Sequence, residues 1–234
     1  MSSPLVSVIV PVFNGERFLA ETLASVRAQT HTPIELIVVD DGSTDGSGDI
    51  IRACPGARCL AQPNRGVAAA RNAGLDAAHG ELLAFIDQDD LWPADSVARR
   101  AGFLLDHPEL DYVLSMVQFF LEPEIEKPVW VREELLARPV PGYNLGNMLI
   151  RRAALERVGR FDTRFVLASD HDWFVRASDL GLAQGRLPDV TLRKRTHDEN
   201  ESRRGSTREM LLIHRESVQR KKAAAAAAST PASR

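Results

Sequence analysis

Short apolar runs alternate with amphipathic segments through the first part of the chain. Runs that are mostly apolar and end in turn residues or acids predict strands at 6–12, 34–40, 58–61 and 82–87. Between them, apolar residues at helical spacing predict three helices. The first covers about residues 18–29, the second begins at Asp45 or Ser47 and ends at residue 53, and the third covers residues 66–78. Strands that alternate with helices of these lengths predict a parallel, doubly wound sheet through about residue 105.

The pattern changes after residue 105. Residues 111–121 and 144–151 are strand-like, 153–158 are helical, and a connection rich in Pro and Glu occupies 122–141. Because regular strand–helix repeats become rarer here, we expect a smaller mixed sheet that extends the parallel one.

The end of the chain is basic and then of low complexity. Between residues 193 and 222, ten Lys and Arg side chains stand against five Asp and Glu. This segment is typical of a solvated helix with a charged face, or of a contact to acidic lipid or to a phosphorylated partner. The Ala run at 223–228 and the residues after it predict a frayed tail.

Composition excludes several classes of protein. The 234 residues are 44% apolar and carry a formal net charge of -3, so one sizeable core is possible and nucleic acid is not an expected partner. Cys54 and Cys59 lie in one Pro/Gly loop without a second ligand cluster, which favours two free thiols in a reducing cytosol. Neither a leader nor a run of ~20 apolar residues is present, which predicts a cytoplasmic protein.

Two of the predicted strands lead directly into carboxylates. Asp40 and Asp41 follow the second strand, and Asp87, Asp89 and Asp90 follow the fourth. Carboxylates crowded at the carboxyl edge of an α/β sheet repel one another unless a cation or a hydrogen-bonded ligand offsets their charge. Since ligands of such sheets bind at this edge, the pattern predicts a metal-assisted nucleotide site.

Two common nucleotide-binding motifs are missing. The turn after the first strand contains neither the G-x-G-x-x-G of dinucleotide folds nor a P-loop. Side chains, rather than a glycine-rich loop, are therefore expected to select the ligand.

Four segments in register resemble glycosyltransferase family 2, whose members have the GT-A fold. They are Val8 to Asn14, Val39 to Asp45, Asn64 to Gly74 and Asp87 to Asp90. The resemblance covers about residues 5–205. It implies transfer of a sugar from a nucleotide-diphosphate donor, with Mn²⁺ or Mg²⁺ as cofactor. It also implies a nucleotide-sugar-binding half at 1–105 and an acceptor-binding and catalytic half at 106–205, before a basic segment and Ala-rich tail at 206–234.

The resemblance assigns donor contacts to residues of the first half. Asp41 is expected to accept a hydrogen bond from the base, which suits the ring N–H of uracil or thymine and hence a UDP- or dTDP-sugar. The alternative for Asp40 and Asp41 is a turn that caps the next helix. Further contacts to the donor are expected from Pro11, Phe13, Asn14, Glu16, Arg71, Asp87 and Gln88.

The metal is expected at Asp89. Asp87 and Asp89 can face one ligand because alternate residues of an extended segment point the same way. Asp90 either shares this work or caps a helix introduced by Pro93. The segment from Arg195 to Ser202 resembles the family signature R-x-H-x-x-N-x-S, which implies that His197 approaches the metal or the diphosphate.

The resemblance places the general base at Asp170. Ser169 stands where the family usually has Glu, so Asp172 remains an alternative. A base opposite the departing diphosphate allows in-line attack and inversion at the sugar. Trp173 is expected either to stack on a sugar or to belong to the core.

The acceptor side is less patterned. Asn147 is expected to hydrogen-bond the acceptor, which could be a saccharide, a lipid carrier, a metabolite or a peptide. The Q-x-x-R-W motif of processive synthases is missing, so addition of a single sugar is expected. Two alternatives are a catalytically idle nucleotide-sugar binder and a nucleotidyltransferase, although the second lacks its glycine-rich signature.

Overall fold

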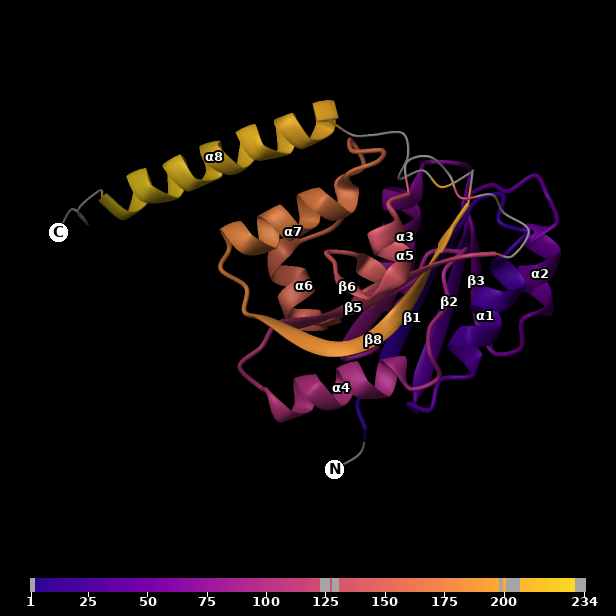
Figure 1. Ribbon diagram of the computed structural model, residues 1–234. Coiled ribbons are helices and arrows are strands. Elements are labelled where there is room, and N and C mark those ends of the chain that lie inside the picture. The colour runs from indigo at the N-terminus through magenta and orange to yellow at the C-terminus, as the bar shows by residue number, and fades with distance from the viewer. Residues whose placement is uncertain (1–2, 123–126, 128–130, 198–199, 201–206, 230–234) are drawn as a thin grey trace.

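The computed structural model describes residues 3–122, 127, 131–197, 200 and 207–229. Within these residues, eight strands form one sheet: β1 Val6–Val12, β2 Ile34–Asp40, β3 Ala57–Ala61, β4 Leu82–Phe85, β5 Tyr112–Leu121, β6 Val140–Pro141, β7 Met148–Arg151 and β8 Gln184–Thr196. Their order across the sheet is β3-β2-β1-β4-β7-β5-β6, and β8 pairs with β5 (Figure 1).

The sheet has a parallel part and a mixed part. β1 pairs in parallel with β2 and β4, and β2 pairs in parallel with β3. β7 runs antiparallel to both β4 and β5, while β8 is parallel to β5. The predicted α/β architecture, a mostly parallel sheet extended by a smaller mixed one, is confirmed.

Helices cover both faces of the sheet. The helices of the described residues are α1 Leu19–Arg27, α2 Ser47–Ala53, α3 Val67–Ala77, α4 Ser96–Asp106, α5 Glu133–Ala137, α6 Arg152–Val158, α7 Ser169–Asp179 and α8 Thr207–Ser229, with a 3₁₀ turn at Leu145–Asn147. Side chains of α3, α6 and α7 share one apolar core with Ile9, whereas those of α1, α2 and α4 share the other core with Val8 and Val10. Successive residues of β1 therefore serve opposite faces, and β1 is buried throughout.

A close helix–sheet contact holds α3 against β1. A Cβ atom at Gly74 would lie 2.4 Å from Cγ2 of Ile9, so only glycine permits this approach. The contact matters because α3 carries Arg71 toward the carboxyl edge of the sheet.

Several segments of the second half differ from the sequence analysis, among them the helix α7, which was not predicted. The strand β8 was not predicted, because it contains Pro188 and ends in charged residues that resemble a solvated segment. The Ala run at 223–228, predicted as a frayed tail, is helical and belongs to α8. Alanine has the highest intrinsic helix propensity, which explains the continuation.

The helix α8 lies along α7, outside the two layers that cover the sheet (Figure 1). Ile213 is buried there together with Phe165 and Ala168. Among the described residues, no helix combines the length and the apolar character needed to cross a bilayer.

Candidate active site

The carboxyl ends of β1, β2 and β4 meet at one edge of the sheet. Val12 pairs with Asp40, and Ile9 pairs with Phe85, two residues before Asp87. The two acidic segments, separated by more than forty residues in the sequence, therefore lie at the same edge.

The loop after β1 is held by the loop after β2. Asn14 has a positive φ of 50° and donates its backbone N–H to Ser43 Oγ at 3.0 Å. Asn14 Oδ1 accepts from the N–H of Thr44 at 2.8 Å, and Glu16 Oε2 accepts from the N–H of Gly46 at 2.6 Å. Asn14 and Glu16, both predicted donor contacts, thus shape this edge through protein hydrogen bonds.

Gln88 ties the end of β4 to the end of β1. Its side-chain Oε1 accepts from the N–H of Phe13 at 2.8 Å, and its Nε2 donates to the Phe13 carbonyl at 3.0 Å. The Phe13 side chain remains 43% exposed, whereas Pro11 is buried within β1. Of these three predicted donor contacts, Phe13 therefore presents the accessible apolar surface.

Asp41 is 2% exposed and holds the loop that precedes α3. Its Oδ1 accepts from Gln62 Nε2 at 2.6 Å and from the N–H of Arg65 at 2.9 Å, while Oδ2 accepts from the N–H of Gly66 at 2.8 Å. Since each carboxylate oxygen can accept two hydrogen bonds, Oδ2 keeps one acceptor position. The neighbouring Asp40 accepts from the N–H of Ser43 at 2.9 Å and so forms a turn, but it lies well before the start of α2 at Ser47 and does not cap that helix.

Asp87 lies between two buried cations. Arg71 Nη2 is 2.9 Å from Asp87 Oδ1, and Lys194 Nζ is 3.7 Å from Asp87 Oδ2. Burial alone would raise the pKa of Asp87, but Arg71 and Lys194 together hold that pKa below its usual value. Asp87 is therefore ionised at neutral pH. The predicted pair of Asp87 and Arg71 is thus brought together.

Asp89 and His197 are neighbours although more than a hundred residues separate them. His197 Nε2 lies 2.9 Å from Asp89 Oδ2, and Asn200 Nδ2 donates to the same oxygen at 3.2 Å. Asn200 Oδ1 also accepts from the N–H of His197 at 2.7 Å. The signature residues at 197 and 200 therefore gather around the carboxylate that was predicted to hold the metal.

The edge can accommodate a divalent cation. Arg71 and Lys194 pair with Asp87 and Asp90, whereas the Asp89 carboxylate contacts His197 and Asn200 and forms no ion pair with either of these two cations. Within the described residues, no group of three or more His, Cys, Asp or Glu side chains is arranged to hold a metal ion by itself. Mg²⁺ usually takes one or two protein carboxylates and completes its shell with phosphate and water, so Asp89, assisted by His197, could hold such an ion.

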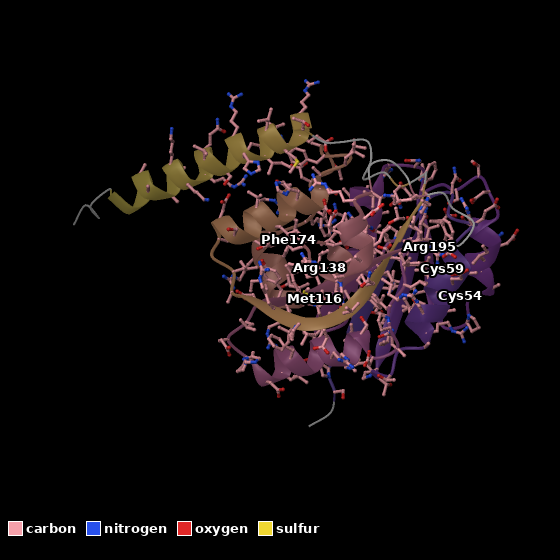
Figure 2. The ribbon with its side chains drawn as sticks, in the orientation of Figure 1. Cys54, Cys59, Met116, Arg138, Phe174 and Arg195 are labelled. Carbon is pink, nitrogen blue, oxygen red and sulfur yellow. The ribbon has the colours of Figure 1, made fainter. Side chains whose placement is uncertain are left out.

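Arg195, labelled in Figure 2, lies near the end of β8 and contacts the backbone of Asp89. It is 1% exposed, and its Nε donates to the Asp89 carbonyl at 2.9 Å. The same guanidinium pairs with Glu21 and Glu122 and lies 4.4 Å from the ring centre of Phe18. These contacts limit the positions that Asp89 can adopt.

Both alternatives predicted for Asp90 are wrong. Asp90 is 0% exposed, and its carboxylate accepts from Lys194 Nζ at 3.1 Å and from the N–H of Arg195 at 3.0 Å. The helix α4 begins at Ser96 and Asp90 does not cap it. Burial raises the pKa of Asp90 to about 7, with Lys194 opposing and Asp89 and Asp87 adding to the shift. Asp90 therefore joins β8 to the acidic loop inside the protein.

Asp170 and Asp172 occupy different surroundings in the first turn of α7. Asp172 is 1% exposed, and its Oδ2 lies 2.8 Å from Nε of Arg176. Asp170 is only partly buried, and its Oδ1 accepts from the backbone N–H of His171 at 2.8 Å. Among the described residues, no side chain is paired with Asp170, so its carboxylate is the more accessible of the two.

Trp173 does not have the accessible ring that sugar stacking needs. It is 0% exposed and packs with Tyr112, Phe161 and Phe174, and its Nε1 donates to the Gly159 carbonyl at 3.2 Å. The stacking role is therefore wrong and the core alternative holds. The sequence left both roles open because the burial of Trp173 depends on the packing of α7 against the sheet, which the sequence does not reveal.

The acceptor contact by Asn147 stays a prediction, which the burial of this side chain restricts to its oxygen Oδ1, for which the described residues supply no partner. Asn147 is 0% exposed, and its amide nitrogen donates to the carbonyls of Ser115 and Gly142. Both amide N–H groups are therefore used to join β5 to the turn before β7, away from solvent.

A sequence profile of Glycosyl transferase family 2 matches residues 7–159, more than half of the chain. The chain belongs to this family. Relatives include an uncharacterized glycosyltransferase of Nostoc sp., 43% identical over 99 residues, and the putative teichuronic acid biosynthesis glycosyltransferase TuaG of Bacillus subtilis, 38% identical over 108 residues. These alignments cover 40% and 44% of this chain, but 31% and 43% of the relatives. The matched part thus spans less than half of either relative.

Solved glycosyltransferases share the fold of this family member. TarS of S. aureus in complex with UDP-GlcNAc superposes with a TM-score of 0.68 and 23% identity, covering 86% of this chain and 61% of TarS. The mannosyltransferase PcManGT from Pyrobaculum calidifontis, in complex with GDP-Man and Mn²⁺, superposes with a TM-score of 0.65 and 23% identity, covering 100% of this chain and 77% of PcManGT. The expected GT-A fold of family 2 is confirmed.

Sequence reasoning missed Lys194. It lies on β8 in a basic run that resembled a solvated segment, yet its side chain is 14% exposed. Burial alone would lower the pKa of Lys194, but Asp90, Asp87 and Asp89 raise it above its usual value. The available signal was the short distance in sequence between Lys194 and the signature residue His197.

Proposed function

We propose that the chain transfers one sugar, with inversion, from a UDP- or dTDP-sugar to an acceptor hydroxyl in a reaction that uses Mn²⁺ or Mg²⁺. The observation that carries this proposal is the approach of Asp89 to His197 beside the paired Asp87 and Arg71. The arrangement lies at the carboxyl edge of the sheet, where ligands of open α/β sheets bind.

The nucleoside is proposed to lie against the loop of residues 13–16. Phe13 offers exposed ring surface there, and Asp41 Oδ2 offers one remaining acceptor position for the ring N–H of uracil or thymine. TarS has been solved with UDP and with UDP-GlcNAc, which supports this class of donor, whereas PcManGT has been solved with GDP-Man.

The diphosphate is proposed to lie near Asp89, where Arg71 adds a permanent positive charge. Bound Mn²⁺ or Mg²⁺ would supply electrostatic stabilisation of the charge that develops on the leaving diphosphate. Asp89 and His197 would hold that ion, and Arg195 would keep Asp89 in place through its carbonyl. Mn²⁺ in the PcManGT structure supports this choice of cofactor.

Asp170 is proposed as the general base that removes the proton of the acceptor hydroxyl. Its carboxylate is partly accessible, whereas that of Asp172 is engaged with Arg176 in the protein interior. A base needs hydrogen-bonding reach to the attacking hydroxyl, which an interior ion pair does not provide.

Turnover of the donor tests the reaction. The full chain is incubated with UDP-glucose and other nucleotide sugars with and without Mn²⁺, and released UDP is measured. We expect metal-dependent release by the wild type, loss of release in Asp170→Asn, and UDP binding within about threefold of wild type in that variant.

Asp172→Asn is the matched control. It removes one negative charge from the same helical turn, so it should lower stability through loss of the Arg176 pair yet keep measurable turnover per folded molecule. Normal transfer by Asp170→Asn would show that the base is assigned wrongly. UDP binding without turnover of any donor by the wild type would favour the idle binder.

A further inference from the structure

The helix α8 has an inner face that is firmly bound to the protein. Ile213 is 0% exposed against Phe165 and Ala168. Ser217 Oγ donates to Asp179 Oδ1 at 2.7 Å, and Arg220 donates to Asp179 Oδ2 at 2.8 Å. The orientation of α8 about its own axis is therefore fixed, and its opposite side faces outward.

Apolar and basic side chains alternate along the outer face. Leu211 is 69% exposed and Val218 is 52% exposed, and both lie half a turn away from the buried Ile213. The exposed cations of the same stripe recur every seven residues: Arg208, Arg215 and Lys222. Figure 2 shows long side chains that project from α8 away from α7.

The acids of α8 are used on the inner side. Glu209 accepts the backbone N–H groups of residues 166–168, and Glu216 pairs with Arg164 at 3.1 Å. The outer stripe, which is defined here as Arg208, Leu211, Arg215, Val218 and Lys222, thus carries cations without an acid. A partner that binds the outer stripe must therefore offer negative charge to the three cations and an apolar region to Leu211 and Val218.

We propose that the outer stripe of α8 docks on the surface of an anionic lipid bilayer. Anionic headgroups complement the three cations, while Leu211 and Val218 enter the boundary with the acyl chains, as in other interfacial helices. The long stems of Arg and Lys allow their charges to stay at headgroup level.

A second copy of this chain suits the stripe less well. A symmetric contact would place one outer stripe against the other, and cations without acids repel one another. A bilayer supplies many negative charges without a matching partner surface.

Docking would also place the proposed base near the bilayer. Glu209 at the start of α8 is bonded to the segment that leads directly into Asp170 at the start of α7. Only this consequence rests on the proposed function, because the docking itself needs no reaction.

Flotation with vesicles tests the docking. The full chain is mixed with vesicles of phosphatidylcholine alone, or of phosphatidylcholine with phosphatidylglycerol, and the bound fraction is measured. We expect binding at least about tenfold stronger to the anionic vesicles, and weaker binding as salt is raised. Leu211→Glu with Val218→Glu should lower the binding at least about tenfold.

Leu105→Glu is the matched control. Leu105 is 55% exposed on α4, which lies on the opposite side of the molecule from α8 (Figure 1), so vesicle binding should not change. Replacement of Arg208, Arg215 and Lys222 by Gln provides a second variant that leaves the inner face untouched. Circular dichroism verifies that each variant is folded.

Three results would overturn the docking proposal. They are equal binding of the wild type to both kinds of vesicle, undiminished binding by both stripe variants, and a dimer in solution that the stripe variants abolish while vesicles are not bound. Release of UDP from UDP-glucose without vesicles should be the same in wild type and stripe variants. A failure of docking can therefore be distinguished from a failure of the proposed reaction.

Discussion

At the scale of single residues, Lys194 shows how charge is balanced beneath the candidate metal position. Its Nζ lies 3.1 Å from Asp90 Oδ2 and 3.7 Å from Asp87 Oδ2. Because Asp90 is 0% exposed, its carboxylate depends on Lys194 and on the N–H of Arg195 for compensation. Loss of the cation would remove this compensation from Asp90 and one of the two cations that Asp87 contacts.

Lys194→Met should lower the free energy of unfolding by about 3 kcal/mol at neutral pH, because removal of one partner of a buried pair is strongly destabilising. The double variant Lys194→Met/Asp90→Asn should recover more than half of that loss, since neither charge remains. Urea denaturation measures both changes.

Lys127→Met provides the comparison for Lys194→Met. Lys127 pairs with Glu133 at the surface, where the two side chains are 38% and 83% exposed, and its loss should have little effect. If the Lys194 and Asp90 substitutions proved simply additive, Lys194 would not be the partner on which Asp90 depends.

Individual site residues were predictable to different degrees. The closeness of Asp89 and His197 could be expected because each lies in a recognisable motif, and the structure brings them to 2.9 Å. Trp173 and Asn147 could not be judged, because burial depends on which side of a helix or turn meets the sheet. Lys194 was missed because a buried cation and a solvated one look alike in a sequence.

At the scale of elements, α8 supports the first turn of α7. Glu209 accepts the N–H groups of Val166, Leu167 and Ala168 at 3.0, 3.1 and 2.9 Å. These N–H groups lie just before α7, where the backbone N–H groups at the start of a helix lack acceptors within the helix. Asp170 lies two residues after Ala168. Glu209 is therefore a positioning residue for the proposed base.

Glu209→Gln should lower kcat about tenfold and leave the KM for the donor within about twofold, because a small displacement of a base affects the chemical step more than donor binding. Steady-state kinetics with a nucleotide sugar measure kcat and KM separately. Glu216→Gln, two turns further along the same inner face of α8, where Glu216 pairs with Arg164 and not with the segment 166–168, should keep kcat close to wild type. Equal losses of kcat in both variants would contradict the positioning role.

The pair of α7 and α8 should also respond to acid through Asp179. Burial alone would raise the pKa of Asp179, but Ser217, Arg220 and Lys221 lower that pKa below its ordinary value of 3.8. The carboxylate therefore contributes stability above the ordinary value, and this contribution is lost as the pH falls through the lowered pKa.

Asp179→Asn should accordingly cost about 1–2 kcal/mol of unfolding free energy at neutral pH. The difference between wild type and variant should be smaller in acid below the lowered pKa of Asp179, where the wild-type carboxyl is protonated, than at neutral pH. Urea denaturation at both pH values measures it. A difference that is the same at both would mean that the charge of Asp179 does not hold α8.

The elements were predicted best where the sequence is plainest. β1 and β2 have the expected bounds, because continuous β-branched runs bounded by turns permit few other structures. β8 was missed because its order comes from pairing with β5, a contact that is distant in the sequence.

At the scale of the whole molecule, the topology explains why the site forms. The order β2-β1-β4 places the acids that follow β2 and β4 at the same edge of the sheet. The strand β8 pairs with β5 and carries Lys194 and Arg195 to this edge, and His197 follows β8 directly. The sequence and the structure establish the family and the fold. The identities of the donor, the metal and the acceptor depend on how those molecules bind at this edge of the sheet.

The most direct measurement is a crystal structure of the chain with UDP and Mn²⁺, in which anomalous scattering locates the metal. The account predicts manganese bound by the Asp89 carboxylate and the diphosphate, with the uridine against residues 13–16. A nucleotide bound at another part of the molecule, or manganese held without Asp89, would contradict it.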